Sequence, residues 1–159
     1  MKRKWTRRNG VIHLTLSDPP RLSGPADDWT AYLEKRGFEV TKPARTILSA
    51  IQMEPPIPHM TRVAIFLGYL FSAGVRTTKN IRREITRRKW LTPHPALAPF
   101  LRDFLSDEEI AQMGLEEIVT LHTPYGGKLL DIDKGRLETA PGGEDEHWHE
   151  EHGFACEIP

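Results

Sequence analysis

The chain has 159 residues, of which 38% are hydrophobic and 28% are charged. This composition can fill a core, so it excludes a wholly disordered protein, and a single cysteine excludes an internal disulfide. The formal net charge of zero conceals an asymmetry. Residues 1–90 carry 18 Lys and Arg against 7 Asp and Glu (net +11), and residues 91–159 carry 4 against 15 (net −11). Such a split bears on binding partners rather than on the fold.

Residues 1–10 are predicted to form a basic N-terminal arm. Its five cations surround a tryptophan and are Lys2, Arg3, Lys4, Arg7 and Arg8. Cations interleaved with an aromatic ring are typical of flexible segments that contact phosphates and stack on bases. The arm leads into residues 11–16, where apolar and polar side chains alternate and predict a short strand.

Three helices are predicted between residues 23 and 73. The first opens at Ser23-Gly-Pro25 and ends at Gly37, where a left-handed C-terminal cap is expected, and the second covers about 43–52. The third, at about 61–73, contains the most hydrophobic run of the chain. That run, Val63 to Val75, has 13 uncharged residues, whereas a bilayer span needs about 20. We therefore expect a buried core helix and no membrane contact.

A further helix is predicted from Thr77 or Thr78 to about Trp90, after a glycine-containing turn. With the preceding helix it resembles a helix-turn-helix, whose second helix lies in the major groove of DNA. Its cations are Lys79, Arg82, Arg83, Arg87, Arg88 and Lys89. The planar fork of arginine suits phosphates and guanine edges, so this helix predicts contact with DNA or RNA. The alternative is an amphipathic helix whose basic face is merely exposed to solvent.

The acidic half is predicted to contain helices at 99–105 and 106–114, another turn or two of helix at 115–121, and a hairpin at 128–138. Ser106 and Glu109 have the spacing of a capping box, in which each side chain satisfies a free backbone amide. Asp131 and Asp133 are two residues apart, so on a strand they would share one face and form a carboxylate pair. No partner for that pair is evident in the sequence.

Residues 139–159 are predicted to form an acidic, His-rich tail that becomes ordered only on binding. Its candidate zinc ligands are His147, His149, His152 and Cys156, because imidazole nitrogen and thiolate sulfur suit a tetrahedral zinc site. In a helix, three of them would share one face. The alternative is an acidic tail that is rich in histidine and binds no metal. The cofactor is therefore either none or Zn²⁺.

Taken together, the patterns predict a mainly α fold with a small β component (α+β). A compact helical domain, residues 11–138, would contain the helix-turn-helix and the short hairpin. The chain contains no phosphate-loop, dinucleotide-binding or hydrolase motif, so a non-enzymatic, cytoplasmic protein is expected. The leading hypothesis is a nucleic-acid-binding accessory or regulatory protein. Two alternatives stay open: an interaction module or inhibitor whose acidic half engages a basic protein, and a metal-binding factor acting through the His/Cys cluster.

Overall fold

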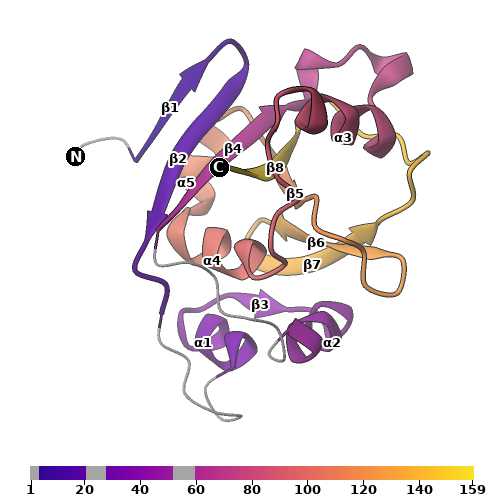
Figure 1. Ribbon diagram of the computed structural model, residues 1–159. Coiled ribbons are helices and arrows are strands. Elements are labelled where there is room, and N and C mark those ends of the chain that lie inside the picture. The colour runs from indigo at the N-terminus through magenta and orange to yellow at the C-terminus, as the bar shows by residue number, and fades with distance from the viewer. Residues whose placement is uncertain (1–3, 21–27, 52–59) are drawn as a thin grey trace.

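The computed structural model describes residues 4–20, 28–51 and 60–159, which form one mixed sheet flanked by helices (Figure 1). The strands are β1 (Trp5–Arg8), β2 (Val11–Ser17), β3 (Glu39–Val40), β4 (Met60–Leu67), β5 (Glu117–Thr120), β6 (Lys128–Asp133), β7 (Arg136–Pro141) and β8 (His152–Ile158). Their order across the sheet is β1-β2-β4-β8-β5-β6-β7-β3. Strand β8 pairs antiparallel with β4 and parallel with β5, so the last strand joins the two halves of the sheet.

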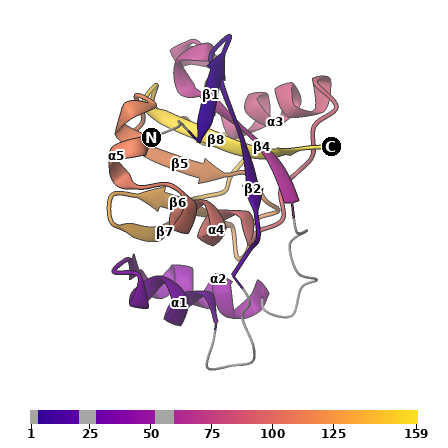
Figure 2. The same cartoon turned by 90° about the vertical axis from the view of Figure 1, so that its left-hand side faces the viewer.

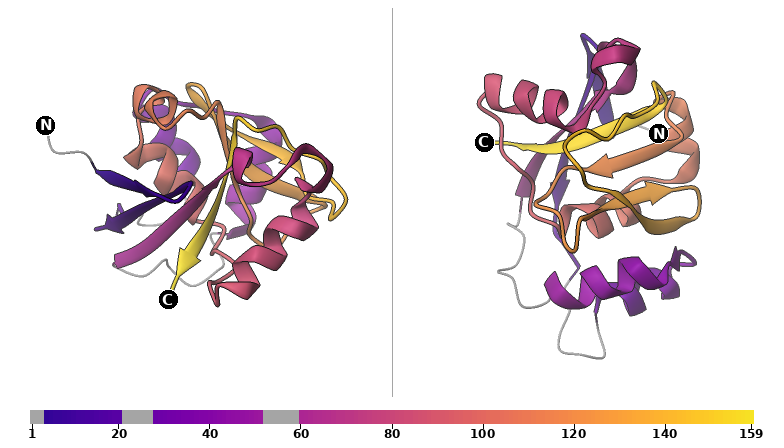
Figure 3. Two further views of the ribbon diagram at one scale, coloured as in Figure 1. Left: turned by 90° about the horizontal axis from the view of Figure 1, so that it is seen from above. Right: turned by 90° about the vertical axis from the view of Figure 1, so that its right-hand side faces the viewer.

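Helices pack on both faces of the sheet. They are α1 (Trp29–Lys35), α2 (Lys42–Ile51), α3 (Thr78–Arg87), α4 (Leu97–Phe104) and α5 (Asp107–Gln112), with single 3-10 turns η2 (Gly68–Leu70) and η3 (Ala73–Val75). Helices α1, α2, α4 and α5 share one core, whereas Ile81 and Ile85 of α3 belong to a second core on the other face. Figures 2 and 3 show α3 separated from α1 and α2 by strands. None of the described helices has the length and apolar character of a membrane span.

The prediction of a mainly α fold is wrong, because strand (34%) and helix (33%) contribute almost equally to the described chain. The largest error concerns residues 61–73, which form β4 and η2 instead of a core helix. Every residue from Val63 to Leu67 is buried, since side chains are covered on both faces of the sheet. A continuous apolar run of this kind lacks the two-residue alternation that identifies a strand. Without that first helix, α3 is not part of a helix-turn-helix.

The C-terminal segment predicted as a tail is part of the sheet. Strand β7 extends to Pro141, and β8 lies between β4 and β5 with Phe154, Ala155 and Cys156 buried. The acidic composition that suggested a tail comes largely from the connecting loop at 142–151. Residues 115–121, predicted as helix, contain β5. In both places most residues of the strand are buried, so it carries little periodic signal.

Local signals at the ends of elements are confirmed. The predicted strand at 11–16 is β2, and the hairpin at 128–138 is the β6–β7 pair. Gly37 follows α1 with a φ of +88°, as a left-handed cap requires, and Ser106 and Glu109 form the expected capping box. The predicted opening of α1 at residues 23–25 lies outside the described residues. At the described end, the Asp28 side chain accepts a hydrogen bond from the amide of Ala31 at 2.7 Å.

Candidate nucleic-acid interface

The predicted N-terminal arm is an edge strand. β1 pairs along its length with β2, and Trp5 is buried in the core, so its ring is not available to stack on a base. The Lys4 ammonium donates to the carbonyl oxygen of Phe104 at 3.1 Å, and Arg7 donates to the carbonyl of Met113. Arg8 is exposed and forms no ion pair with a described residue. The other two predicted contacts, Lys2 and Arg3, lie outside the described residues.

Half of the cations predicted on α3 and at its C-terminal end form hydrogen bonds or ion pairs within the protein. Arg82 donates to the carbonyl oxygens of Leu121 and His122 at 2.7 and 2.9 Å, which fastens α3 to the end of β5. Its guanidinium also lies 3.3 Å from Glu144, and burial lowers the pKa of Arg82. Replacing Arg82 would therefore disturb the fold as well as any ligand.

Arg87 and Arg88 share one carboxylate. Both guanidinium groups lie against the same oxygen of Glu84, at 2.6 and 2.8 Å. The hydrogen bond from Arg87 is the main reason that the pKa of Glu84 falls to about 2. Of the predicted helix contacts, Lys79, Arg83, Arg87 and Lys89 are exposed, and of these four Arg87 is paired with Glu84. The exposed cations of α3 are thus fewer than the sequence indicates.

A different group of basic side chains lies around His13 of β2. Arg8 of β1, Arg62 of β4 and Arg88 beyond α3 all act on this imidazole. Together with burial, the largest cause, their charges lower the pKa of His13. We call Arg8, His13, Arg62 and Arg88 the basic face.

The strand register explains why these side chains meet. Thr6 and Ala64 lie opposite His13 on the two neighbouring strands. Arg8 is two residues from Thr6 on β1, and Arg62 is two residues from Ala64 on β4. Both therefore lie on the same face as His13, as diagonal neighbours about 7–8 Å from it. The alternation of β2 thus directs Ile12 and Leu14 to the core and His13 to the opposite face.

Two aromatic rings contact side chains at one end of the basic face. The Trp90 ring meets His13 edge-on, with 6.1 Å between ring centroids. The Arg88 guanidinium lies 5.1 Å from the ring centroids of both Trp90 and Phe66. Cation–π contacts of this kind hold a guanidinium in place while its outward N–H groups remain able to donate.

A groove of about 410 Å³ adjoins the basic face. The described residues that line it include Lys4, His13 and Arg62 but no Asp or Glu, although the Lys4 ammonium lies 3.5 Å from Glu109 outside the groove lining. Two further lining residues, Thr6 and Thr15, are exposed and offer hydroxyl groups. Guanidinium, ammonium and hydroxyl donors are the groups that proteins direct at nucleic-acid phosphates.

His13, Arg62 and Trp90 are not among the site residues that the sequence predicts. The alternation at 11–16 contains the signal for His13, because it places this residue opposite the apolar face. Arg62 was assigned to a helix, and only its position in β4 brings it beside β2. Trp90 was noted only as an apolar position of the helix.

The predicted zinc ligands do not converge on one point. Cys156 is buried within β8, where burial raises the pKa of its thiol to about 12. His152, at the start of the same strand, is four residues and therefore about 13 Å away along the chain. Its Nδ1 accepts from the amide of His149 at 2.9 Å, and its Nε2 lies 3.1 Å from Glu117. His147 is exposed in the loop before β8. Among the described residues, these four do not form a group with metal-ligand proximity.

Comparison of the chain with protein-family models, with curated proteins and with solved structures finds no match.

Proposed function

We propose that the protein binds nucleic acid through the basic face. The observation that carries this proposal is the convergence of three arginines, from three separate segments, around His13 on an exposed part of the sheet. Like charges repel, so a cluster of guanidinium groups that the core does not require is stabilised by binding an anion. Arg88 is paired with Glu84. Arg62 donates one N–H to the carbonyl oxygen of Pro159 at 3.1 Å. Neither Arg8 nor Arg62 has an Asp or Glu partner among the described residues, which leaves most of their donors able to bind such an anion.

The extent of the basic face favours a polyanion over a single small anion. Neighbouring strands lie about 4.8 Å apart, so β1 to β4 spans about 10 Å. Nucleotides in one strand of a duplex are separated by about 3.4 Å along the axis, so two or more phosphates fit across this width. Guanidinium and hydroxyl contacts of this type read the backbone rather than the base sequence. We therefore expect binding with little sequence preference.

Replacing both Arg8 and Arg62 with alanine is expected to weaken nucleic-acid binding by at least about tenfold, since a hydrogen bond to a charged group contributes about 1.5–3 kcal/mol. The measurement is fluorescence anisotropy with a labelled DNA duplex and a labelled single-stranded RNA at fixed low salt. These two arginines are chosen because both are exposed and neither holds two elements together by an ion pair with Asp or Glu.

The matched control is the double variant Arg36→Ala, Arg45→Ala. Both side chains are 56% exposed and lie near α1 and α2, away from the basic face. The control removes the same charge, so it should keep most of the affinity. Equal losses in the two double variants would mean that net charge, and not the basic face, drives binding, and the proposal would be abandoned.

A further inference from the structure

Four carboxyl groups of neighbouring strands meet at the other end of the sheet, far from β1 in the strand order. Glu117 lies on β5, Asp131 and Asp133 on β6, and Glu138 on β7. Asp131 lies opposite Glu138 in the ladder. Oxygens of Glu117, Asp133 and Glu138 all lie within 4.8 Å of one another, and in the part of the chain that the structure describes no other group of three His, Cys, Asp or Glu residues has this proximity.

The fourth carboxyl group, that of Asp131, is buried, and one of its oxygens lacks a hydrogen-bond partner. Its side chain is 2% exposed, and its Oδ1 has no hydrogen-bond partner among the described residues. The side chain is directed at the same cluster, because Asp131 is two residues from Asp133 on β6 and lies opposite Glu138 on β7. A buried polar atom left without a partner costs about 1–3 kcal/mol, and native structures usually supply a water or an ion. This orphaned oxygen is evidence for a ligand that is independent of the three-carboxylate group.

The neighbouring cations do not balance the cluster. The Arg136 guanidinium lies 2.8 Å from Asp133 and 3.4 Å from Glu138. His152 donates to Glu117 as a neutral ring, because its Nδ1 already accepts a backbone amide hydrogen. Three carboxylates thus face one guanidinium, which leaves two negative charges. A divalent cation would neutralise them.

The coordination chemistry of the three oxygens favours one kind of divalent cation. An ion that touches two ligands can hold them no farther apart than twice its bond length. All three oxygens lie within 4.8 Å of one another, so calcium–oxygen bonds of about 2.3–2.6 Å can reach them together. Calcium accepts irregular coordination, whereas Mg²⁺ demands near-ideal octahedral geometry and keeps several of its waters. An all-oxygen ligand set also suits a hard cation rather than zinc.

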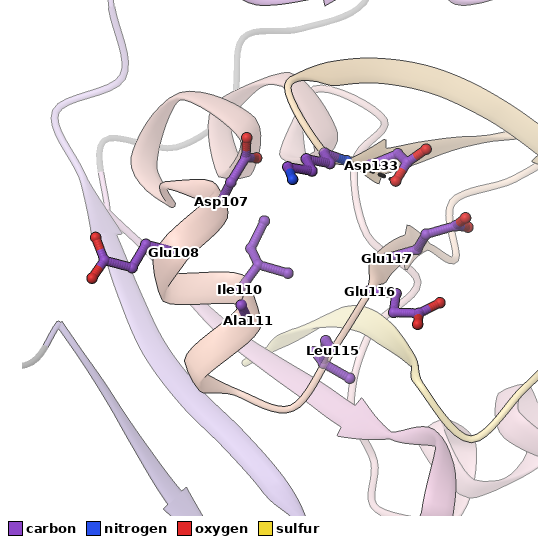
Figure 4. A pocket seen from close by; sticks show the side chains of 9 residues that line it. Asp107, Glu108, Ile110, Ala111, Leu115, Glu116, Glu117 and Asp133 are labelled. Atoms are coloured by element: carbon purple, nitrogen blue, oxygen red, sulfur yellow. Dashed lines mark hydrogen bonds between the residues drawn. The ribbon is translucent and has the colours of Figure 1, made fainter.

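The cluster is accessible from solvent. Glu117 and Asp133 line a pocket of about 490 Å³ between α5 and the β5–β6 strands. Figure 4 shows these two side chains at the strand side of the pocket, with their carboxylate oxygens directed away from Ile110 of α5. Partial exposure of all three carboxylates leaves room for water to complete the coordination shell.

We propose that Glu117, Asp133 and Glu138 bind one calcium ion, with the buried carboxyl of Asp131 beside them. The site is separate from the basic face and does not depend on nucleic-acid binding.

Isothermal titration of the chelator-treated full chain with calcium chloride tests this site. We expect one site per chain, a higher thermal midpoint with calcium, and at least about tenfold weaker binding of magnesium chloride. Glu138→Gln should weaken calcium binding by at least about tenfold. Glu116→Gln is the matched control, because Glu116 is exposed, lines the same pocket and lies outside the group. This variant should bind calcium as the wild type does.

A second ligand variant, Asp133→Asn, keeps the test valid if Glu138→Gln fails to fold. Circular dichroism shows whether each variant is folded. Calcium binding that survives in a folded variant of either kind would place the ion elsewhere and overturn the assignment. No saturable heat and no thermal shift at up to about 10 mM calcium would overturn it as well, since this exceeds the weakest sites of extracellular calcium modules.

Discussion

Arg102→Ala is expected to lower the free energy of unfolding by about 3–5 kcal/mol, which is the cost of breaking a buried charged network. Arg102 is fully buried in α4, and it lies 4.5 Å from the ring centroid of Phe38. Its guanidinium donates to the carbonyl oxygens of Leu105 and Asp133, each at 2.7 Å, and pairs with Asp107 at 3.0 Å. Burial lowers the pKa of Arg102, and the Asp107 carboxylate opposes that shift. Alanine would leave two carbonyl groups unpaired and open a cavity.

The effect is measured by urea denaturation followed by circular dichroism. Arg36→Ala is the control, because Arg36 also pairs with a carboxylate, that of Asp103 at 2.9 Å, but is 56% exposed. Exposed pairs contribute about 0–1 kcal/mol, so this variant should be nearly as stable as the wild type. A loss of less than about 1 kcal/mol in Arg102→Ala would contradict the role of Arg102 in joining α4 to the β6–β7 hairpin.

Acidification from pH 6.5 to pH 4 is expected to remove about 3 kcal/mol of stability through His122. This ring is fully buried: its Nε2 accepts from the amide of Leu130 at 2.9 Å, and its Nδ1–H donates to the carbonyl oxygen of Thr123 at 2.7 Å. Burial lowers its pKa from 6.5 to about 4. Between these values the unfolded chain binds a proton that the folded chain does not, so stability is complete above pH 6.5 and falls as the pH falls.

The urea midpoint, measured from pH 8 to pH 4, tests this dependence. His122→Gln removes the titrating group and keeps an acceptor, so its stability should vary less with pH even if it is lower at pH 8. His147→Gln is the control, since His147 is exposed and should leave the pH profile unchanged. If His122→Gln keeps the full pH dependence of the wild type, another group is responsible.

Signals confined to a few residues predicted the structure well. The capping box at Ser106 and Glu109, the left-handed Gly37 and the β6–β7 hairpin all depend on neighbours in sequence, and all are confirmed. The placement of Asp131 and Asp133 on one strand followed from the same local reasoning. Their partners, Glu117 and Glu138, come from adjacent strands, so only the sheet register brings the four carboxyl groups together.

Long-range pairing explains the errors. Strands β4 and β8 are buried on both faces because a hydrophobic core covers each side of the sheet, and an element covered on both faces loses its periodic pattern. The same pairing determines the basic face. Arg62 and His13 are 49 positions apart in the chain and meet because β2 pairs with β4. Charge composition shows that most cations lie in the first 90 residues, whereas the grouping of Arg8, His13 and Arg62 depends on the strand register.

The salt dependence of nucleic-acid binding tests the central claim most directly. Three arginines that contact phosphates predict a log–log slope of about −3, because each neutralised phosphate contributes about −0.9. The Arg8→Ala, Arg62→Ala double variant should reduce the steepness by about 2. Absence of binding at low salt, or an equal slope in wild type and double variant, would contradict a phosphate-binding role for the basic face.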